Sequence, residues 1–262
     1  MMPSMWIAKT GLDAQQNNMN VISNNLANVN TNGFKKSRAV FEDLVYKANN
    51  CKNEEYNGEE NLDNYYDAGA GAGAKTIEIQ KNFSQGNLLK TDSSQDIAIN
   101  GDGFFQIQMP DGSLAYTRNG SFQINKNRQL VNHNGLLVQP NITLPENFTE
   151  IYINKNGEVS VKLKDSKEKV SIGQIGLAIF SNNYGLKSIG QNLYKETQIS
   201  GKAIEVEPGI YDVGELQQGY LETSNVNIAE ELINMIQTQR AYEINSKSIN
   251  ASDKMLQKIC EL

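Results

Sequence analysis

The longest stretch of this chain without proline or glycine lies near its C-terminal end and includes residues 227–260. An uninterrupted helix requires that both residue types be absent from its interior. Asn227 stands at an N-cap position with Glu230 three residues later, a capping box with Asn in place of Ser or Thr. We therefore predict a helix over residues 227–260. Alternate steps of three and four residues give a partly apolar stripe along it: Ile228, Leu232, Met235, Gln239, Tyr242, Ser246, Ile249, Asp253, Leu256 and Cys260.

A second helical pattern lies at the N-terminal end of the sequence. Its stripe is Met5, Ala8, Leu12, Gln15, Met19, Ile22, Leu26 and Val29. Asparagine recurs between these positions and disfavours a helix by up to about 0.7 kcal/mol per residue relative to alanine. Burial of each large apolar side chain returns about 1.5–3 kcal/mol, but only against a partner. We therefore expect this helix to be poor in isolation and to pair with residues 227–260. We expect it to end at Asn32, with Gly33 as a left-handed C-cap.

The C-terminal segment also carries a second partly apolar edge: Ala241, Ile244, Ser248, Ala251 and Met255. A helix with two such edges has more than one neighbour to contact. The simpler alternative is two amphipathic helices that close an ordinary intramolecular core, and periodicity alone does not separate these interpretations.

Composition excludes several classes of function. The net charge is −6 and the mean hydropathy is −0.52, and no apolar run approaches the ~20 residues of a membrane span. We therefore expect neither membrane insertion nor nucleic-acid binding, and we interpret the one basic cluster, at residues 35–38, as a solvated loop face. Residues 1–16 lack the features of a cleaved signal peptide. Cys51 and Cys260 fit neither a disulfide framework nor a metal site.

The middle of the chain predicts a β domain after an extended connection. Residues 34–46 are compatible with helix or strand, and residues 49–67 are acidic and polar and predict a mobile or extended segment. From residue 75 to about 180, short alternating apolar runs are separated by Asn-Gly and Asp-Gly turns, which is typical of hairpins. We expect residues 185–219 to be irregular.

No pattern in the sequence predicts catalysis or cofactor binding. The acidic segment 49–67 does not match a calcium-binding loop and is better explained as solvated. His133, the one histidine, falls in a predicted turn without a second ligand nearby. The Gly101–Gly103 turn lacks the third glycine and following helix of a dinucleotide site. We predict no catalytic residues, no metal and no cofactor.

Two terminal motifs resemble those of the bacterial flagellar rod and hook protein family. The N-terminal motif comprises Ser23, Asn24, Asn25, Leu26, Ala27, Asn28, Thr31, Gly33, Phe34 and Lys35. The C-terminal motif comprises Gly219, Leu221, Glu222, Ser224, Asn225, Val226, Glu230, Glu231, Met235, Ile236, Gln239, Arg240, Tyr242, Asn245, Met255 and Leu256. Between them, three segments resemble the family's β domain: GDGFFQIQ (101–108), YTRNGSF (116–122) and SIGQNLY (188–194).

The resemblance covers nearly the whole chain, and residues 5–16 and 41–46 are most similar to the distal-rod members. The sequence departs from the family in two places. Residues 126–128 replace a turn that often contains glycine, and residues 47–74 keep little of the segment thought to stiffen the distal rod.

The resemblance implies an α+β fold in which the terminal helices form an antiparallel coiled coil. The corresponding domains are residues 1–33 paired with 226–262, a connecting and rod-specific extended segment 34–74, a hairpin-rich β domain 75–219, and the C-terminal helix 220–262. The implied function is a structural subunit of the distal rod, a tubular drive shaft that transmits torque to the hook, with no enzymatic activity. Export would use the flagellar type III apparatus, without a cleaved signal peptide.

The predicted assembly contacts are Leu12, Met19, Ile22, Leu26, Leu232, Met235, Tyr242, Ile249 and Leu256. The implied partners are other copies of the chain, proximal rod proteins, the hook protein or hook-side junction, and the surrounding P-ring and L-ring proteins. The alternatives are a proximal rod or hook subunit of the same family, or a secreted coiled-coil adhesin or binding module.

Overall fold

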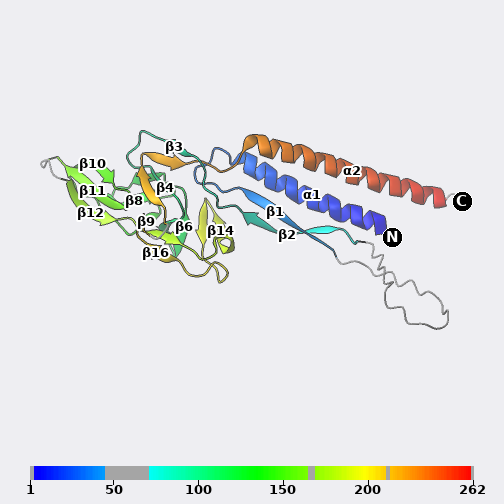
Figure 1. Cartoon of the computed structure of the whole chain (residues 1–262), viewed down its shortest axis with the longest axis horizontal. Coiled ribbons are helices and arrows are strands. Elements are labelled where there is room, and N and C mark those ends of the chain that lie inside the picture. The colour runs from blue at the N-terminus through cyan, green and yellow to red at the C-terminus, as the bar shows by residue number, and fades with distance from the viewer. Residues whose placement is uncertain (1–2, 45–70, 165–168, 211–212, 261–262) are drawn as a thin grey trace. The chain divides into compact units, whose positions relative to one another are not determined.

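The computed structural model describes residues 3–44, 71–164, 169–210 and 213–260 (Figure 1). A long helix lies near each end of the sequence, and all other described elements except one short 3-10 helix are strands. The fold is therefore α+β, as predicted. Within the described residues, no helix has both the length and the apolar character that a membrane span requires.

The first helix, α1 (Pro3–Ala27), is shorter than the sequence predicts. We expected it to continue to Asn32, but the chain leaves the helix after Ala27 and forms successive turns, in which the backbone N–H groups of Asn28 and Thr31 donate to the carbonyls of Asn25 and Asn28. The Thr31 hydroxyl donates to the Asn28 side chain at 3.2 Å. Such short polar side chains bond locally and compete with helix continuation, which explains the early end.

The second helix, α2 (Ile228–Cys260), begins and ends where the sequence predicts. Glu230 and Glu231 lie in its first turn and Lys258 in its last, so the charges complement the helix dipole at both ends.

The chain forms two compact units. The first comprises Met1–Asn24, Ser37–Gln80 and Ala229–Leu262, and the second comprises Asn25–Lys36 and Lys81–Ile228. In the first unit, β1 (Ser37–Asp43) pairs with β2 (Ala74–Lys81), so the sequence ambiguity over residues 34–46 is resolved as a strand. Residues 45–70, which include Cys51 and the acidic segment 49–67, lie outside the described residues.

The second unit contains the β domain. Its strands are β3 (Leu88–Lys90), β4 (Ile97–Asn100), β5 (Phe105–Gln108), β6 (Leu114–Thr117), β7 (Phe122–Ile124), β8 (Leu130–Asn132), β9 (Leu137–Gln139), β10 (Phe148–Ile153), β11 (Glu158–Leu163), β12 (Lys169–Gln174), β13 (Leu177–Ile179), β14 (Lys187–Gly190), β15 (Leu193–Lys195), β16 (Ile204–Val206), β17 (Glu215–Gln218) and β18 (Tyr220–Glu222). A 3-10 turn, η1 (Asn183–Gly185), precedes β14.

The strands form several small sheets around one main core. The largest has the order β14-β15-β6-β5-β9-β8-β7, and the next is β10-β11-β12; β13-β16, β17-β4 and β18-β3 are pairs. The main core contains buried Ile97, Ile99, Phe105, Ile107, Val159, Val161, Leu177 and Leu216. A second, aromatic cluster contains Phe104, Tyr116, Phe180 and Tyr194. The alternating strands between residues 75 and 180 are thus confirmed.

The expectation that residues 185–219 are irregular is wrong. This segment contains β14, β15, β16 and β17. Each has three or four residues and pairs with a strand distant in sequence or across a tight turn, for example Tyr194 with Tyr116 and Leu216 with Ile99. Strands this short do not show a local alternation, which is why the sequence pattern missed them.

Candidate functional site

A group of buried charged side chains in the second unit lies where the two terminal motifs meet the β domain. We call this site the terminal junction and define it as residues 33–36, 82–86, 118–119 and 222–225. The first range continues from α1 and the last precedes α2, so the site gathers segments that are about 190 residues apart in sequence.

Glu222, the last residue of β18, is at the centre of the terminal junction. Its Oε1 accepts hydrogen bonds from Lys35 Nζ at 2.6 Å and from the Gly86 backbone N–H at 2.9 Å. Its Oε2 lies 3.1 Å from Arg118 Nε. Lys35, Arg118 and Glu222 are 1%, 3% and 1% exposed, so one carboxylate neutralises part of the charge of two buried cations.

Carbonyl groups hold both cations in place. The Arg118 guanidinium donates to the carbonyls of Gly103 and Gly101 at 2.7 and 2.8 Å. Lys35 Nζ also donates to the Ser84 carbonyl at 2.8 Å. Buried charges are tolerated only when they are paired and hydrogen-bonded, and these contacts meet that condition.

Backbone contacts join the N-terminal segment to the C-terminal one. The Gly33 N–H donates to the Glu222 carbonyl at 2.8 Å, and the Lys36 N–H donates to Asn225 Oδ1 at 2.7 Å. The Asn225 amide nitrogen in turn donates to the carbonyls of Asn82 and Ser84, both at 3.0 Å. One asparagine side chain therefore connects both terminal segments to residues 82–84.

Gly33 has a conformation that only glycine adopts without strain. Its φ is +70°, in the left-handed region, and a Cβ there would lie 2.6 Å from the backbone nitrogen of Asn119. The sequence correctly predicted the left-handed conformation, although the helix ends six residues earlier.

Phe34 fills the apolar side of the terminal junction. It is 6% exposed, and the Lys81 ammonium lies 5.1 Å from its ring centroid and 6.0 Å from that of Tyr194. Burial lowers the pKa of Lys81 and raises the pKa of the Tyr194 hydroxyl.

Burial also lowers the pKa of Lys35, and the charge of Arg118 lowers it further, while the charge of Glu222 opposes both effects. Within this site, Glu222 is therefore the group that favours the charged form of Lys35.

The interpretation of residues 35–38 as a solvated basic face is wrong for Lys35. The sequence shows a lysine beside Lys36 and Arg38, but not the carboxylate 187 residues away that neutralises it. The signal that could have found this ion cluster is the presence of Lys35, Arg118 and Glu222 within three separate motifs of the resemblance.

The structure places the predicted assembly residues at different depths. On α1, Ile22 is buried and Leu12, Met19 and Leu26 are half-buried. On α2, Leu232 and Tyr242 are exposed, whereas Met235, Ile249 and Leu256 are half-buried. Their roles in assembly stay a prediction.

Within the first unit, α1 and α2 lie side by side (Figure 1) and contact each other through polar and small residues. Asn18 donates to the Thr238 hydroxyl at 3.0 Å, and a Cβ built on Gly11 would lie 2.9 Å from the Asn245 amide nitrogen. The order of these two contacts is that of an antiparallel pair. The buried positions on the two helices also include Ala14, Val21 and Glu231, which lie off the predicted stripes.

Two further features of the β domain are His133 and a cavity beside β10. His133 is exposed in a turn, as predicted, with its ring nitrogens 2.9 Å from the Ser121 hydroxyl and 3.2 Å from the Gln123 amide. Among the residues that the structure describes, no cluster of His, Cys, Asp or Glu could hold a metal ion.

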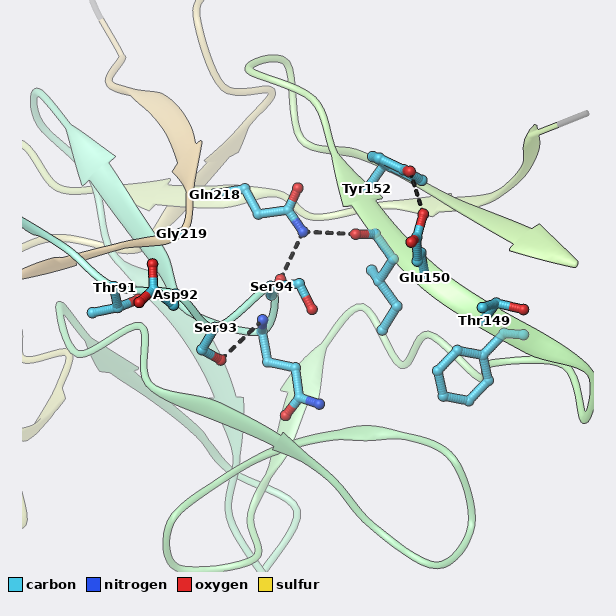
Figure 2. Close-up of a pocket in the computed structure, with 12 residues that line it drawn as sticks. Thr91, Asp92, Ser93, Ser94, Thr149, Glu150, Tyr152, Gln218 and Gly219 are labelled. Atoms are coloured by element: carbon cyan, nitrogen blue, oxygen red, sulfur yellow. Dashed lines mark hydrogen bonds between the residues drawn. The ribbon is translucent and has the colours of Figure 1, made fainter.

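The cavity, of about 590 Å³, lies between residues 91–95 and β10 (Figure 2). Gln218 closes one side of it, because its amide nitrogen donates to the carbonyls of Ser94 and Ile151. Its amide oxygen accepts from the Ile153 N–H. These bonds hold the β10-β11-β12 sheet to the rest of the domain, which is a structural role.

Three family models match the chain. They are the flagellar hook protein FlgE/F/G D1 domain over residues 98–161, the flagellar basal body rod FlgEFG protein C-terminal region over residues 217–262, and the flagella basal body rod protein over residues 5–35. The matched ranges include parts of the terminal junction from both ends of the chain and from the β domain.

Full-length relatives are similar over the whole chain. The flagellar basal-body rod protein FlgG of Buchnera aphidicola subsp. Schizaphis graminum is 57% identical over 100% of both chains. The protein of the same name from Borreliella burgdorferi is 49% identical over 98% of this chain and 97% of its own. A crystal structure of the Helicobacter pylori flagellar hook protein FlgE2 covers 59% of this chain and 47% of its own, with 16% identity and a TM-score of 0.24, an overlap too low to support any argument.

A buried site that ties distant chain segments together and a helix with exposed apolar side chains are features of a structural assembly subunit. The chain belongs to the FlgG family of flagellar basal-body rod proteins. This membership confirms the prediction of a structural subunit of the flagellar distal rod, in a family that is structural and not enzymatic.

Proposed function

We propose that copies of this chain polymerise into the rigid tube of the distal rod and transmit torque by packing alone. Each subunit would pair α1 and α2 as an antiparallel coiled coil and present the outer edges of the pair to neighbouring copies. Repeated contacts of this kind build a filament when their rotation does not close into a ring. The proposed domains are a terminal coiled coil from residues 1–33 and 226–262, in which the helix α1 itself ends at Ala27, a connecting segment 34–74 and a β domain 75–219.

The observation that carries this proposal is the apolar surface of α2. Ile228, Leu232 and Ile236 follow one another at intervals of four residues and are 49%, 43% and 50% exposed. Tyr242, Ile244 and Met255 are exposed further along the same helix. In a single chain these side chains contact water, so contact with another copy removes apolar area that the monomer cannot bury, at about 25 cal/mol per Å².

The proposed surroundings follow from the family. The subunit would span the periplasm within the basal body, after export without a cleaved signal peptide. Its neighbours would be proximal rod proteins, the hook protein or hook-side junction, and the P-ring and L-ring proteins.

The test is Leu232→Asp, compared with Gln237→Asp as a matched control at an exposed polar position of the same helix. An unpaired charge in a packed contact costs several kcal/mol, so we expect Leu232→Asp to prevent rod formation while the purified monomer keeps its circular dichroism spectrum. Rods of normal length with Leu232→Asp would refute the proposal. Labelled protein located only in the proximal rod or hook of purified basal bodies would favour those family members instead.

A further inference from the structure

The charges of the terminal junction impose an order on how its segments come together. Arg118 belongs to the β domain, and its guanidinium is held by the carbonyls of Gly101 and Gly103. Neither contact involves a terminal segment. The buried positive charge of Arg118 is therefore in place once the β domain has folded.

The C-terminal segment has its own attachments to the β domain. β18 pairs with β3 from Tyr220↔Lys90 to Glu222↔Leu88, and the Thr223 N–H donates to the Asn87 carbonyl at 2.8 Å. Asn225 donates to residues 82 and 84. With this segment docked alone, Glu222 still has Arg118 and the Gly86 N–H as partners, and the local charges balance.

The N-terminal segment depends on groups that the C-terminal segment supplies. The Gly33 and Lys36 N–H groups both donate to it, at the Glu222 carbonyl and the Asn225 side chain. Without Glu222, the Lys35 ammonium would enter a buried site beside Arg118, and the charge of Asp102 would be the remaining compensation for two like charges. Like charges desolvated at close range are strongly unfavourable.

We infer that Glu222 makes docking of residues 33–36 conditional on prior docking of residues 220–225, so residues 33–36 attach to the β domain last. The dependence is one-way: removal of Lys35 leaves a balanced Arg118–Glu222 pair, whereas removal of the Glu222 charge leaves both cations without their ion-pair partner. This inference concerns the folding of the chain and does not rest on its role in the rod.

The experiment is hydrogen–deuterium exchange by mass spectrometry on the full chain, as wild type, Glu222→Gln, Lys35→Met and the double variant. Loss of one partner of a buried pair corresponds to about a hundredfold or more in the local equilibrium, so amides of residues 33–36 should exchange at least that much faster in Glu222→Gln. Amides of β5 should stay protected, which shows that the domain is folded. In Lys35→Met, amides of β18 should remain within a few-fold of wild type.

The double variant separates electrostatic gating from simple loss of contacts. If the Lys35 charge opposes docking, the double variant should exchange its amides at residues 33–36 at least tenfold more slowly than Glu222→Gln does. Protection in the double variant equal to or lower than in Glu222→Gln would overturn the inference. So would a release of β18 in Lys35→Met as large as the release of residues 33–36 in Glu222→Gln. If β5 also loses protection in Glu222→Gln, Glu222→Asp is measured instead. This variant keeps the negative charge, so residues 33–36 should stay protected, and their release would overturn the inference.

Discussion

Gly33→Ala tests whether the terminal junction is held by close backbone packing as well as by charge. An alanine at a left-handed φ costs about 1–2 kcal/mol, of which about 0.4–1 kcal/mol returns through the lower entropy of the unfolded chain. The new Cβ would also lie 2.6 Å from Asn119 N and 2.8 Å from Asn119 Cα, which are backbone atoms that cannot rotate away. Overpacking of this kind adds about 1–3 kcal/mol, so the expected total is about 2–4 kcal/mol.

Gly135→Ala is the matched control, because Gly135 has φ +77° and a Cβ there would have no atom within 4 Å. It should cost only the backbone contribution, about 1 kcal/mol. The assay is urea unfolding of both variants followed by circular dichroism, with amide exchange to detect local release of residues 33–36. Equal losses of stability in the two variants, with residues 33–36 equally protected, would refute the packing argument.

Three further predictions concern the β domain and its attachments. Burial, with smaller contributions from nearby carboxylates, raises the pKa of Tyr116 to about 12, from 10 in the unfolded chain. The protonated Tyr116 hydroxyl therefore contributes its full stabilisation below pH 10, and this contribution is lost as the pH rises through 12. Tyr116→Phe should remove about 2 kcal/mol of that alkaline loss in pH-dependent urea unfolding; an unchanged profile would contradict it. Asn225→Ala should cost about 1–3 kcal/mol and expose the Lys36 amide to exchange, and unchanged exchange there would show that the side chain does not hold the segment. Leu216 is 1% exposed, so Leu216→Ala should cost about 2–5 kcal/mol of stability in thermal unfolding. Leu114 is 37% exposed, so Leu114→Ala should cost far less. Similar losses of stability in the two variants would be inconsistent with the core described above.

The sequence predicted those features that depend on neighbours along the chain. The limits of α2 follow from an N-cap and the absence of proline and glycine, and the hairpins follow from turn residues every eight to twelve positions. The left-handed Gly33 was also predictable, because it follows a run of polar residues at the end of a helical pattern.

The terminal junction was not predictable in the same way, because its chemistry depends on distant pairs. Nothing near Lys35 in the sequence indicates that Glu222 neutralises it or that Arg118 lies beside it. The buried face of α1 was also misplaced for some residues: periodicity selected Leu12 and Leu26, which are half-buried, while Ala14 is among the buried ones. A hydrophobic stripe identifies a surface that seeks burial, but not the molecule that will cover it.

The polar contact between α1 and α2 has a mechanical consequence. Asn18 and Thr238 meet across it, whereas Ile233 and Ile236 of the same helix contact solvent. Hydrogen bonds that water can replace add little net free energy, so this contact alone stabilises the helix pair only weakly. In the proposed rod, stiffness would then be a collective property, which arises where neighbouring copies cover the isoleucines and is lost when a single subunit is removed.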